Sequence, residues 1–175
     1  MNKISAYYDL KRLKHCISVA ELCYQIADNS AKVSPEDAYM AGLLHDIGKS
    51  CEDKKTIMEK FFSRYANLPE FSHHQFVGRY IAENVFGITN KDILEAIEFH
   101  ATGNSKMSLL AKIVYAADKI DPSRGYNSKV MISKMMSDPE KGFKYVLGEN
   151  KKYLEQTGKS IDNPLTSKCF KDYLK

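Results

Sequence analysis

The sequence lacks the features that mark membrane, exported and disulfide-stabilised proteins. Its 175 residues contain no apolar run of 18 residues, so no membrane-spanning helix is predicted. The opening stretch MNKISAYYDLKRLKH has no apolar core of the kind found in signal peptides, so we expect a cytoplasmic protein that does not act at a membrane. Cys16, Cys23, Cys51 and Cys169 form no C-x-x-C pair, which argues against a disulfide framework and a cysteine-based zinc site.

The chain also lacks a block of basic residues. Its net charge is only +4 and its lysines are spread along the sequence, which favours a small anionic ligand over a nucleic-acid partner. Strand patterns do not recur, and no internal repeat, low-complexity segment or linker divides the chain. A content of 43% hydrophobic and 27% charged residues is typical of a globular protein. We therefore predict one domain over residues 1–175, large enough to bury a core without a structural metal.

Helix-start and helix-stop signals do recur along the chain. Capping residues precede apolar-periodic segments at Ser34-Pro35, Asn90, Ser108, Asp138-Pro139 and Asn163-Pro164. The sequence predicts an all-α, single-domain helical bundle of about eight helices. We expect them near residues 8–30, 35–47, 52–66, 72–86, 91–101 and 109–120, with two more that begin at residues 139 and 164.

Five side chains that commonly bind metals fall on the apolar stripes of these helices. They are His15, His45, His74, His100 and Asp118. One inward histidine is most often a core residue bonded to a backbone carbonyl. Five on five helices are harder to explain in this way, because each buried polar group without a partner costs about 1–3 kcal/mol against a net stability of roughly 5–15 kcal/mol. Convergence on one metal site in the bundle core removes that cost.

The segment LLHDIGK places His45 and Asp46 in the last turn of a predicted helix. Helix C-termini carry partial negative charge, which favours a cation just beyond the helix end. Lys49 follows the predicted stop at Gly48, where it could contact an anionic group on a metal-bound substrate. Without a metal, Lys49 would be an ordinary solvated lysine.

The order H…HD…H…H…D resembles the HD-domain metal-dependent phosphohydrolases. The resemblance is closer to the YqeK-like branch, which hydrolyses symmetrical dinucleoside tetraphosphates. It is carried by RLKHCISV, LLHDIGK, HHQFVGRYIAENVFGI, FHATG, LLAKIVYAADKIDPSRGY and IDNPLT, which together span nearly the whole chain.

The resemblance implies roles for particular residues. His15, His45, Asp46 and Asp118 would bind a first metal. His74 and His100 would complete a second or contact phosphate, with Asp46 bridging. His74 is preferred to His73 because it lies on the apolar stripe of its helix. Asp46 and Lys49 would be catalytic, Asp46 by orienting or deprotonating the attacking water. The expected substrate-binding positions are Lys49, His74, His100, Thr102, Gly103, Arg124, Ile161, Asp162, Asn163, Pro164, Leu165 and Thr166.

A ligand set of imidazoles and carboxylates without thiolate suits one or two divalent ions, with iron or manganese favoured and zinc or cobalt also compatible. The leading hypothesis is hydrolysis of a symmetrical dinucleoside tetraphosphate, the nucleotide partner, to two nucleoside diphosphates. Three alternatives stay open. The first is a phosphohydrolase acting on another nucleotide, either a 5′-nucleotidase or a cyclic-dinucleotide phosphodiesterase, although the GYP signature of the latter is absent. The others are a diiron oxygenase and a non-catalytic nucleotide sensor. A homodimer and a lid formed by residues 52–60 also stay open.

Overall fold

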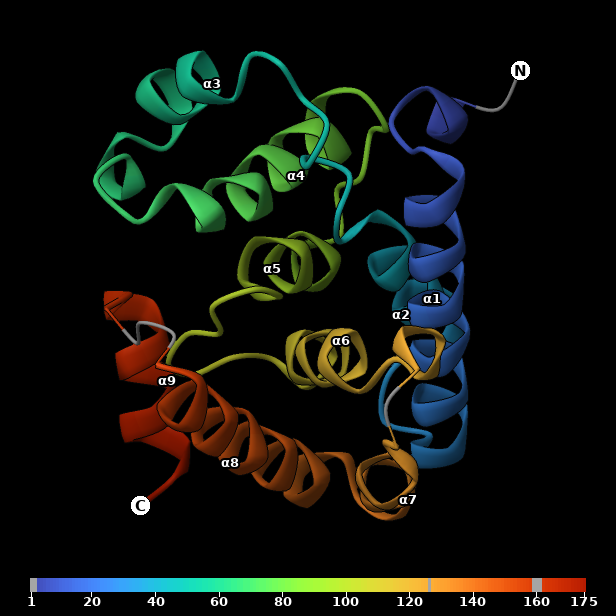
Figure 1. Cartoon of the computed structure of the whole chain (residues 1–175). Coiled ribbons are helices and arrows are strands. Elements are labelled where there is room, and N and C mark those ends of the chain that lie inside the picture. Colours follow the sequence, from blue (N-terminus) through green and yellow to red (C-terminus); the bar gives the residue numbers. More distant parts are fainter. Residues whose placement is uncertain (1–2, 126, 159–161) are drawn as a thin grey trace.

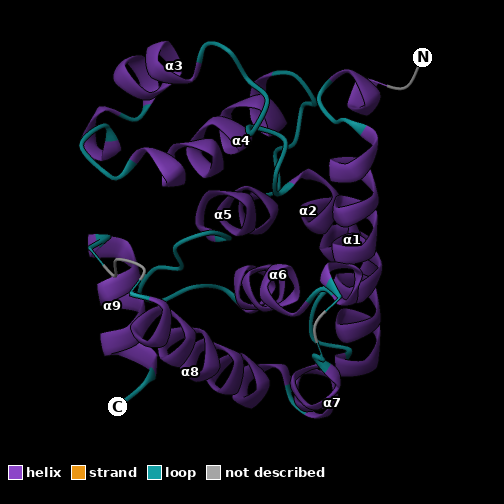
Figure 2. Cartoon of the chain, in the orientation of Figure 1, coloured by secondary structure: helices purple, strands orange, loops and turns teal. Residues whose placement is uncertain are grey.

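The computed structural model describes residues 3–125, 127–158 and 162–175, and these residues form helices and loops without a strand (Figure 2). The predicted all-α class is confirmed. The α-helices are α1 (Leu10–Ser30), α2 (Pro35–Leu44), α3 (Lys54–Phe61), α4 (His73–Asn84), α5 (Lys91–Phe99), α6 (Leu109–Ile120), α7 (Lys129–Ser137), α8 (Pro139–Thr157) and α9 (Pro164–Tyr173). Short 3₁₀ turns are η1 (Lys3–Ala6), η2 (Ser63–Tyr65), η3 (Glu70–Ser72) and η4 (Pro122–Arg124). None of the described helices has the length and apolar character needed to cross a bilayer.

Side-chain caps fix most of the helix starts. Ser34, Asn90, Ser108, Asp138 and Asn163 each accept a hydrogen bond from a backbone N–H in the first turn of the helix that follows. These N–H groups have no partner within the helix, so a side-chain oxygen in this position stabilises the helix start. The five predicted caps are therefore confirmed.

The boundaries differ from the sequence predictions in three places. Helix α3 spans Lys54–Phe61 rather than residues 52–66, because the backbone leaves the helical conformation at Phe62 (φ −130°) and the 3₁₀ turn η2 follows. Helix α2 ends at Leu44 rather than near residue 47, and residues 45–50 form turns. Helix α7 was missed altogether. The residue before it, Ser128, makes no side-chain cap, so the local start signal is absent. Instead α7 packs closely on α8, where a Cβ on Gly142 would lie 2.6 Å from the Met135 Cα.

The helices surround a central pair (Figure 1). Helices α5 and α6 lie in the middle and pack against each other, while α1 and α2 lie side by side along one flank. Helices α3 and α4 cover one end, and α7, α8 and α9 cover the other. The core includes the fully buried side chains of Phe76, Ile97, Ile113, Tyr115 and Phe143. This arrangement directs α1, α2, α4, α5 and α6 toward one interior region.

The turn after α2 is pressed against α4. A Cβ on Gly48 would lie 2.2 Å from the His74 carbonyl oxygen and 2.5 Å from the Gly78 nitrogen, so only glycine allows this approach. The contact is between two backbones, which have little freedom to move apart. It places the residues just before Gly48 beside the start of α4.

Candidate metal centre

The side chains predicted to point inward do converge. With Asp46 they form two groups of three, and within each group the candidate donor atoms lie within 4.8 Å of one another; the Cys16 sulfur lies equally close to donor atoms of His45 and Asp46. The groups are His15, His45 and Asp118, and Asp46, His74 and His100. All six side chains are nearly or fully buried.

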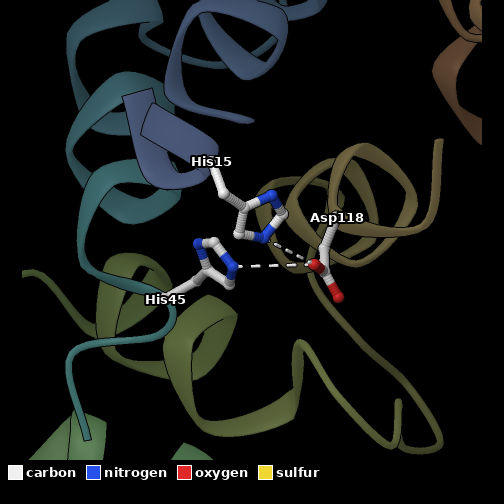
Figure 3. Close-up of side chains that lie close together, drawn as sticks. All are labelled: His15, His45 and Asp118. Atoms are coloured by element: carbon white, nitrogen blue, oxygen red, sulfur yellow. Dashed lines mark ion pairs between the residues drawn. The ribbon is translucent and has the colours of Figure 1, made fainter. Parts of the chain in front are cut away.

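The first group joins α1, the end of α2 and α6 (Figure 3). His15 Nε2 lies 3.2 Å from Asp118 Oδ1, and His45 Nε2 lies 3.6 Å from the same oxygen. The two rings meet edge to face with centroids 5.2 Å apart. Both Nε2 atoms therefore face one carboxylate oxygen.

The second group lies against Asp46. Its Oδ1 is 3.3 Å from His100 Nε2 and 3.5 Å from His74 Nε2, and these two nitrogens are 3.1 Å apart. Its other oxygen, Oδ2, is 3.6 Å from His45 Nε2 in the first group. Asp46 thus contacts both groups, the position that a carboxylate bridging two cations would occupy.

Three of the rings are oriented by the backbone. Each Nδ1 lies 2.6 to 2.8 Å from the carbonyl oxygen of the residue three positions earlier. The pairs are His45 with Gly42, His74 with Phe71, and His100 with Ile97. A carbonyl only accepts, so Nδ1 carries the proton and the Nε2 lone pair faces the cluster. This is how metal-binding histidines are held in the correct tautomer.

The fourth ring, His15, is oriented by a carboxylate. Its Nδ1 lies 2.6 Å from Asp121 Oδ2, and Asp121 is fully buried and also accepts from Ser18 Oγ at 2.6 Å and from the Ser123 N–H at 2.9 Å. Burial lowers the pKa of His15, but hydrogen bonds to Asp118 and Asp121 outweigh burial and the pKa is raised. A more basic imidazole is a better metal donor.

Electrostatics favour the binding forms of the other donors. Burial acts to raise the pKa of Asp46, but His45, His100 and His74 outweigh it and hold that pKa well below its usual range. Burial also acts to raise the pKa of Asp118, and Lys119 with His15 and His45 reverses this. Burial lowers the pKa of His100 to about 3. At neutral pH the carboxylates are therefore ionised and His100 is neutral.

One buried atom indicates that a cation fits here. His45 Nε2 has no hydrogen-bond partner among the described residues, although its ring is fully buried. A buried polar atom without a partner costs about 1–3 kcal/mol. Its neighbours at 3.6 Å are oxygens of Asp46 and Asp118, which are acceptors like itself. A divalent cation among these atoms would satisfy all three, and an imidazole and carboxylate donor set suits such an ion.

Cationic side chains surround the two carboxylates. Arg12 Nη1 lies 2.7 Å from Asp46 Oδ2 and Lys49 Nζ lies 3.2 Å from the same oxygen, while Arg124 contacts Asp118 and His15. Lys49 and Arg124 were selected from the sequence, and Arg12 was not. The signal for Arg12 was its position three residues before His15, which places both on one face of α1.

Three other predicted substrate positions, Thr102, Gly103 and Thr166, make contacts among α4, the loop after α5 and α9. The Thr102 hydroxyl is buried, with Gln75 Nε2 3.0 Å away, and Thr166 Oγ1 donates to the Thr102 carbonyl at 3.0 Å. A Cβ on Gly103 would lie 2.6 Å from Cys169 Sγ, so this glycine packs against α9. These contacts join the loop after α5 to α9, and a nucleotide-binding role for Thr102, Gly103 and Thr166 stays a prediction.

A nucleotide-binding role for the segment before α9 and the first turns of that helix also stays a prediction. Asn163 caps the helix, Pro164 begins it and Leu165 is buried, while Asp162 is exposed. Ile161 lies outside the described residues.

His73 and His74 point in different directions. His73 Nε2 lies 2.8 Å from the Leu68 carbonyl, whereas His74 Nε2 faces Asp46. The geometry therefore favours His74 over His73 as a donor.

The sequence reasoning also missed Asp121. No local spacing links it to His15, which lies 106 positions away, and its only signal was an acidic side chain directly before Pro122.

Asp121→Asn is expected to lower the affinity for Mn²⁺ by about 10- to 100-fold, because it weakens the hydrogen bond that orients His15 while keeping the side-chain shape. Electron paramagnetic resonance of free Mn²⁺ during a titration measures this. Asp28→Asn, on the exposed face of α1, is the control, and equal affinities for the two variants would contradict the expectation.

Comparisons with known proteins identify the family of this chain. The sequence pattern of the HD domain matches residues 12–123. A probable nicotinate-nucleotide adenylyltransferase/Ap4A hydrolase of Mycoplasma genitalium is 35% identical over 123 residues, 69% of this chain and 35% of that protein. The symmetrical bis(5′-nucleosyl)-tetraphosphatase of Bacillus subtilis is 31% identical over 119 residues, 66% of this chain and 63% of that protein. The matched segment thus spans about a third of the first relative and less than two thirds of the second.

A solved structure is similar over almost the whole chain. It is described as a predicted HD superfamily hydrolase involved in NAD metabolism from Clostridium acetobutylicum, and it superposes with a TM-score of 0.82 at 28% identity. The match covers 98% of this chain and 93% of that one. With the matched HD pattern covering more than half of its residues, this chain belongs to the HD domain family.

Proposed function

We propose that this chain is a metal-dependent phosphohydrolase that cleaves symmetrical dinucleoside tetraphosphates, such as diadenosine tetraphosphate, to two nucleoside diphosphates. The observation that carries the proposal is the position of Asp46, which contacts both donor groups and the cations of Arg12 and Lys49. Phosphoryl transfer needs cations and fixed positive side chains around the reacting phosphate. The names of the Mycoplasma and Bacillus relatives support the choice of substrate.

Six residues would hold the cofactor. His15, His45, Asp46 and Asp118 would bind one divalent ion, and Asp46, His74 and His100 would bind a second. We favour iron or manganese, with zinc and cobalt also compatible, because the donors are imidazoles and carboxylates. Such ions lower the pKa of water toward about 7 and draw charge from a phosphoryl group.

The residues of the chain would act on the substrate and on the water. Asp46 orients the attacking water. Lys49, Arg12 and Arg124 neutralise the charge that grows on the phosphoryl oxygens. The water oxygen forms a bond to one of the two central phosphorus atoms, and the bond from that phosphorus to the central bridging oxygen breaks. The bridging oxygen keeps the electron pair and leaves on the second nucleoside diphosphate, while the proton of the water passes to solvent.

Product analysis tests the proposal. Purified protein with Mn²⁺ or Fe²⁺ is expected to convert diadenosine tetraphosphate to ADP alone, because attack at either central phosphorus gives the same pair of products. Ion-exchange chromatography separates ADP from AMP and ATP. The reaction should stop when the metal is chelated and in the Asp46→Asn variant.

Other products would redirect the assignment. AMP together with ATP would place the cut off centre and overturn the symmetrical reaction. Turnover of a nucleoside monophosphate or a cyclic dinucleotide, with diadenosine tetraphosphate left intact, would identify a phosphohydrolase with another nucleotide substrate.

A further inference from the structure

Two pockets adjoin at the candidate metal centre. The larger has a volume of about 1020 Å³ and is lined by Lys11, Lys14 and Arg124, which we call the basic lobe. The smaller has a volume of about 440 Å³ and is lined by Lys54 and Phe71, which we call the aromatic lobe. Asp9, Arg12 and Lys49 line both pockets and form the shared wall between them. The two pockets are therefore neighbours in one cleft.

Each lobe opens on a different donor group. His15, from the first group, lines the basic lobe, and His74, from the second, lines the aromatic lobe. Asp46, which contacts both groups, is held by Arg12 and Lys49 of the shared wall. A molecule that crosses the shared wall would thus have its middle beside Asp46 and one half in each lobe.

The aromatic lobe offers a surface for a nucleobase. The Phe71 side chain is 60% exposed at this pocket, and its backbone carbonyl accepts from His74 Nδ1 at 2.7 Å. Phe71 is therefore hydrogen-bonded through its backbone to a candidate metal donor that lines the same pocket. Aromatic rings in this situation stack on bases of any type.

The basic lobe has a different chemistry. Lys11, Lys14 and Arg124 provide three positive charges, and the described residues that line it include no phenylalanine or tyrosine. Such a surface suits phosphate oxygens rather than a base.

We propose that the two lobes bind the two halves of a dinucleoside polyphosphate. Its phosphate chain crosses the shared wall, one nucleobase stacks on Phe71, and Lys11, Lys14 and Arg124 hold the phosphates of the other half. This inference rests on the proposed function for the identity of the substrate. It adds a stacking residue and a division of the cleft that explain how a long, two-ended molecule is centred on Asp46.

Calorimetric binding of ADP and of pyrophosphate to the Mn²⁺-loaded protein tests the stacking. Phe71→Ala should weaken ADP binding by about tenfold, a typical loss for removing an aromatic ring that stacks on a base, and leave pyrophosphate binding within twofold. The substitution keeps the carbonyl that orients His74, so the donors should stay in place. Phe61→Ala is the matched control, because Phe61 is 50% exposed on α3 and lines neither lobe.

Three results would overturn the stacking. They are an unchanged ADP affinity in Phe71→Ala, an equal loss for ADP and pyrophosphate, and a wild-type protein that binds ADP no more tightly than pyrophosphate. The hydrolysis assay separates this inference from the proposed function. A protein that loses ADP affinity through Phe71→Ala but leaves diadenosine tetraphosphate intact would overturn the reaction and retain the stacking.

A non-hydrolysable diadenosine tetraphosphate with a methylene group at its centre tests the division into lobes. Phe71→Ala and Lys14→Ala should each weaken its binding, and the double variant should weaken it by the product of the two factors, because distant residues act additively. Lys144→Ala, on the exposed face of α8, should have no effect. An unchanged affinity in Lys14→Ala would overturn the assignment of the basic lobe.

Discussion

Asp46→Asn is expected to reduce the proposed hydrolysis by at least about 10³-fold, the upper range for losing one preorganised electrostatic group. Asp46 contacts donors of both groups, so its loss affects two candidate ion sites at once. Asparagine keeps the shape but lacks the negative charge that a cation requires. Initial rates with diadenosine tetraphosphate measure the effect on the reaction.

The same variant should bind fewer Mn²⁺ ions per chain. The electron paramagnetic resonance signal of free Mn²⁺ measures this number independently of catalysis. Circular dichroism should show a helical protein, and Asp28→Asn provides a charge-matched control at an exposed position. Full metal stoichiometry in Asp46→Asn would show that this carboxylate is not a ligand, whatever happens to the rate.

Gly48→Ala is expected to lower the free energy of unfolding by about 3 kcal/mol, toward the upper end for forcing extra atoms into a packed site. The added Cβ would meet two backbone atoms of α4, the His74 oxygen and the Gly78 nitrogen, neither of which can rotate away. For a chain of this length the melting temperature should fall by about 6–12 °C, measured by circular dichroism. Since the clash pushes His74 away from Asp46, Mn²⁺ affinity should fall as well.

Gly148→Ala supplies the opposite case. Gly148 lies inside α8, where the nearest atom to an added Cβ is Leu174 Cδ2 at 4.0 Å. Alanine is favoured over glycine in a helix interior, so this variant should gain about 0.5–1 kcal/mol of stability. If Gly48→Ala and Gly148→Ala shifted the melting temperature in the same direction, the close approach of Gly48 to α4 would not explain the effect of Gly48→Ala.

The helical fold could be predicted because its start signals are local. Ser34, Asn90 and Ser108 each bond to a backbone N–H within three residues, so the information lies in a few adjacent letters. Helix α7 lacks such a cap, and its position depends on packing against α8. Helix α2 ends earlier than predicted for a similar reason, because Gly48 must lie outside the helix to pack on α4. Contacts between distant segments leave no periodic signal in a single sequence.

The residues of the candidate site were likewise predictable only where their signal is local. Helical spacing indicated that His15, His45, His74, His100 and Asp118 face inward, and the structure brings these side chains together. Spacing gave no indication of Asp121, whose contact with His15 exists only after α6 has packed on α1. The two lobes of the cleft were equally hidden, because residues near positions 10, 50, 70 and 124 meet only in the folded chain.

The scatter of the donors along the sequence also links cation supply to folding. The six candidate donors come from five segments between residues 15 and 118, and an unfolded chain cannot hold the atoms of either group within 4.8 Å of one another. A cation that binds only the folded chain shifts the folding equilibrium by mass action, by about 2.7 kcal/mol when its free concentration is 100 times its dissociation constant. Metal starvation would then act on this protein twice, through its chemistry and through the fraction of chains that stay folded.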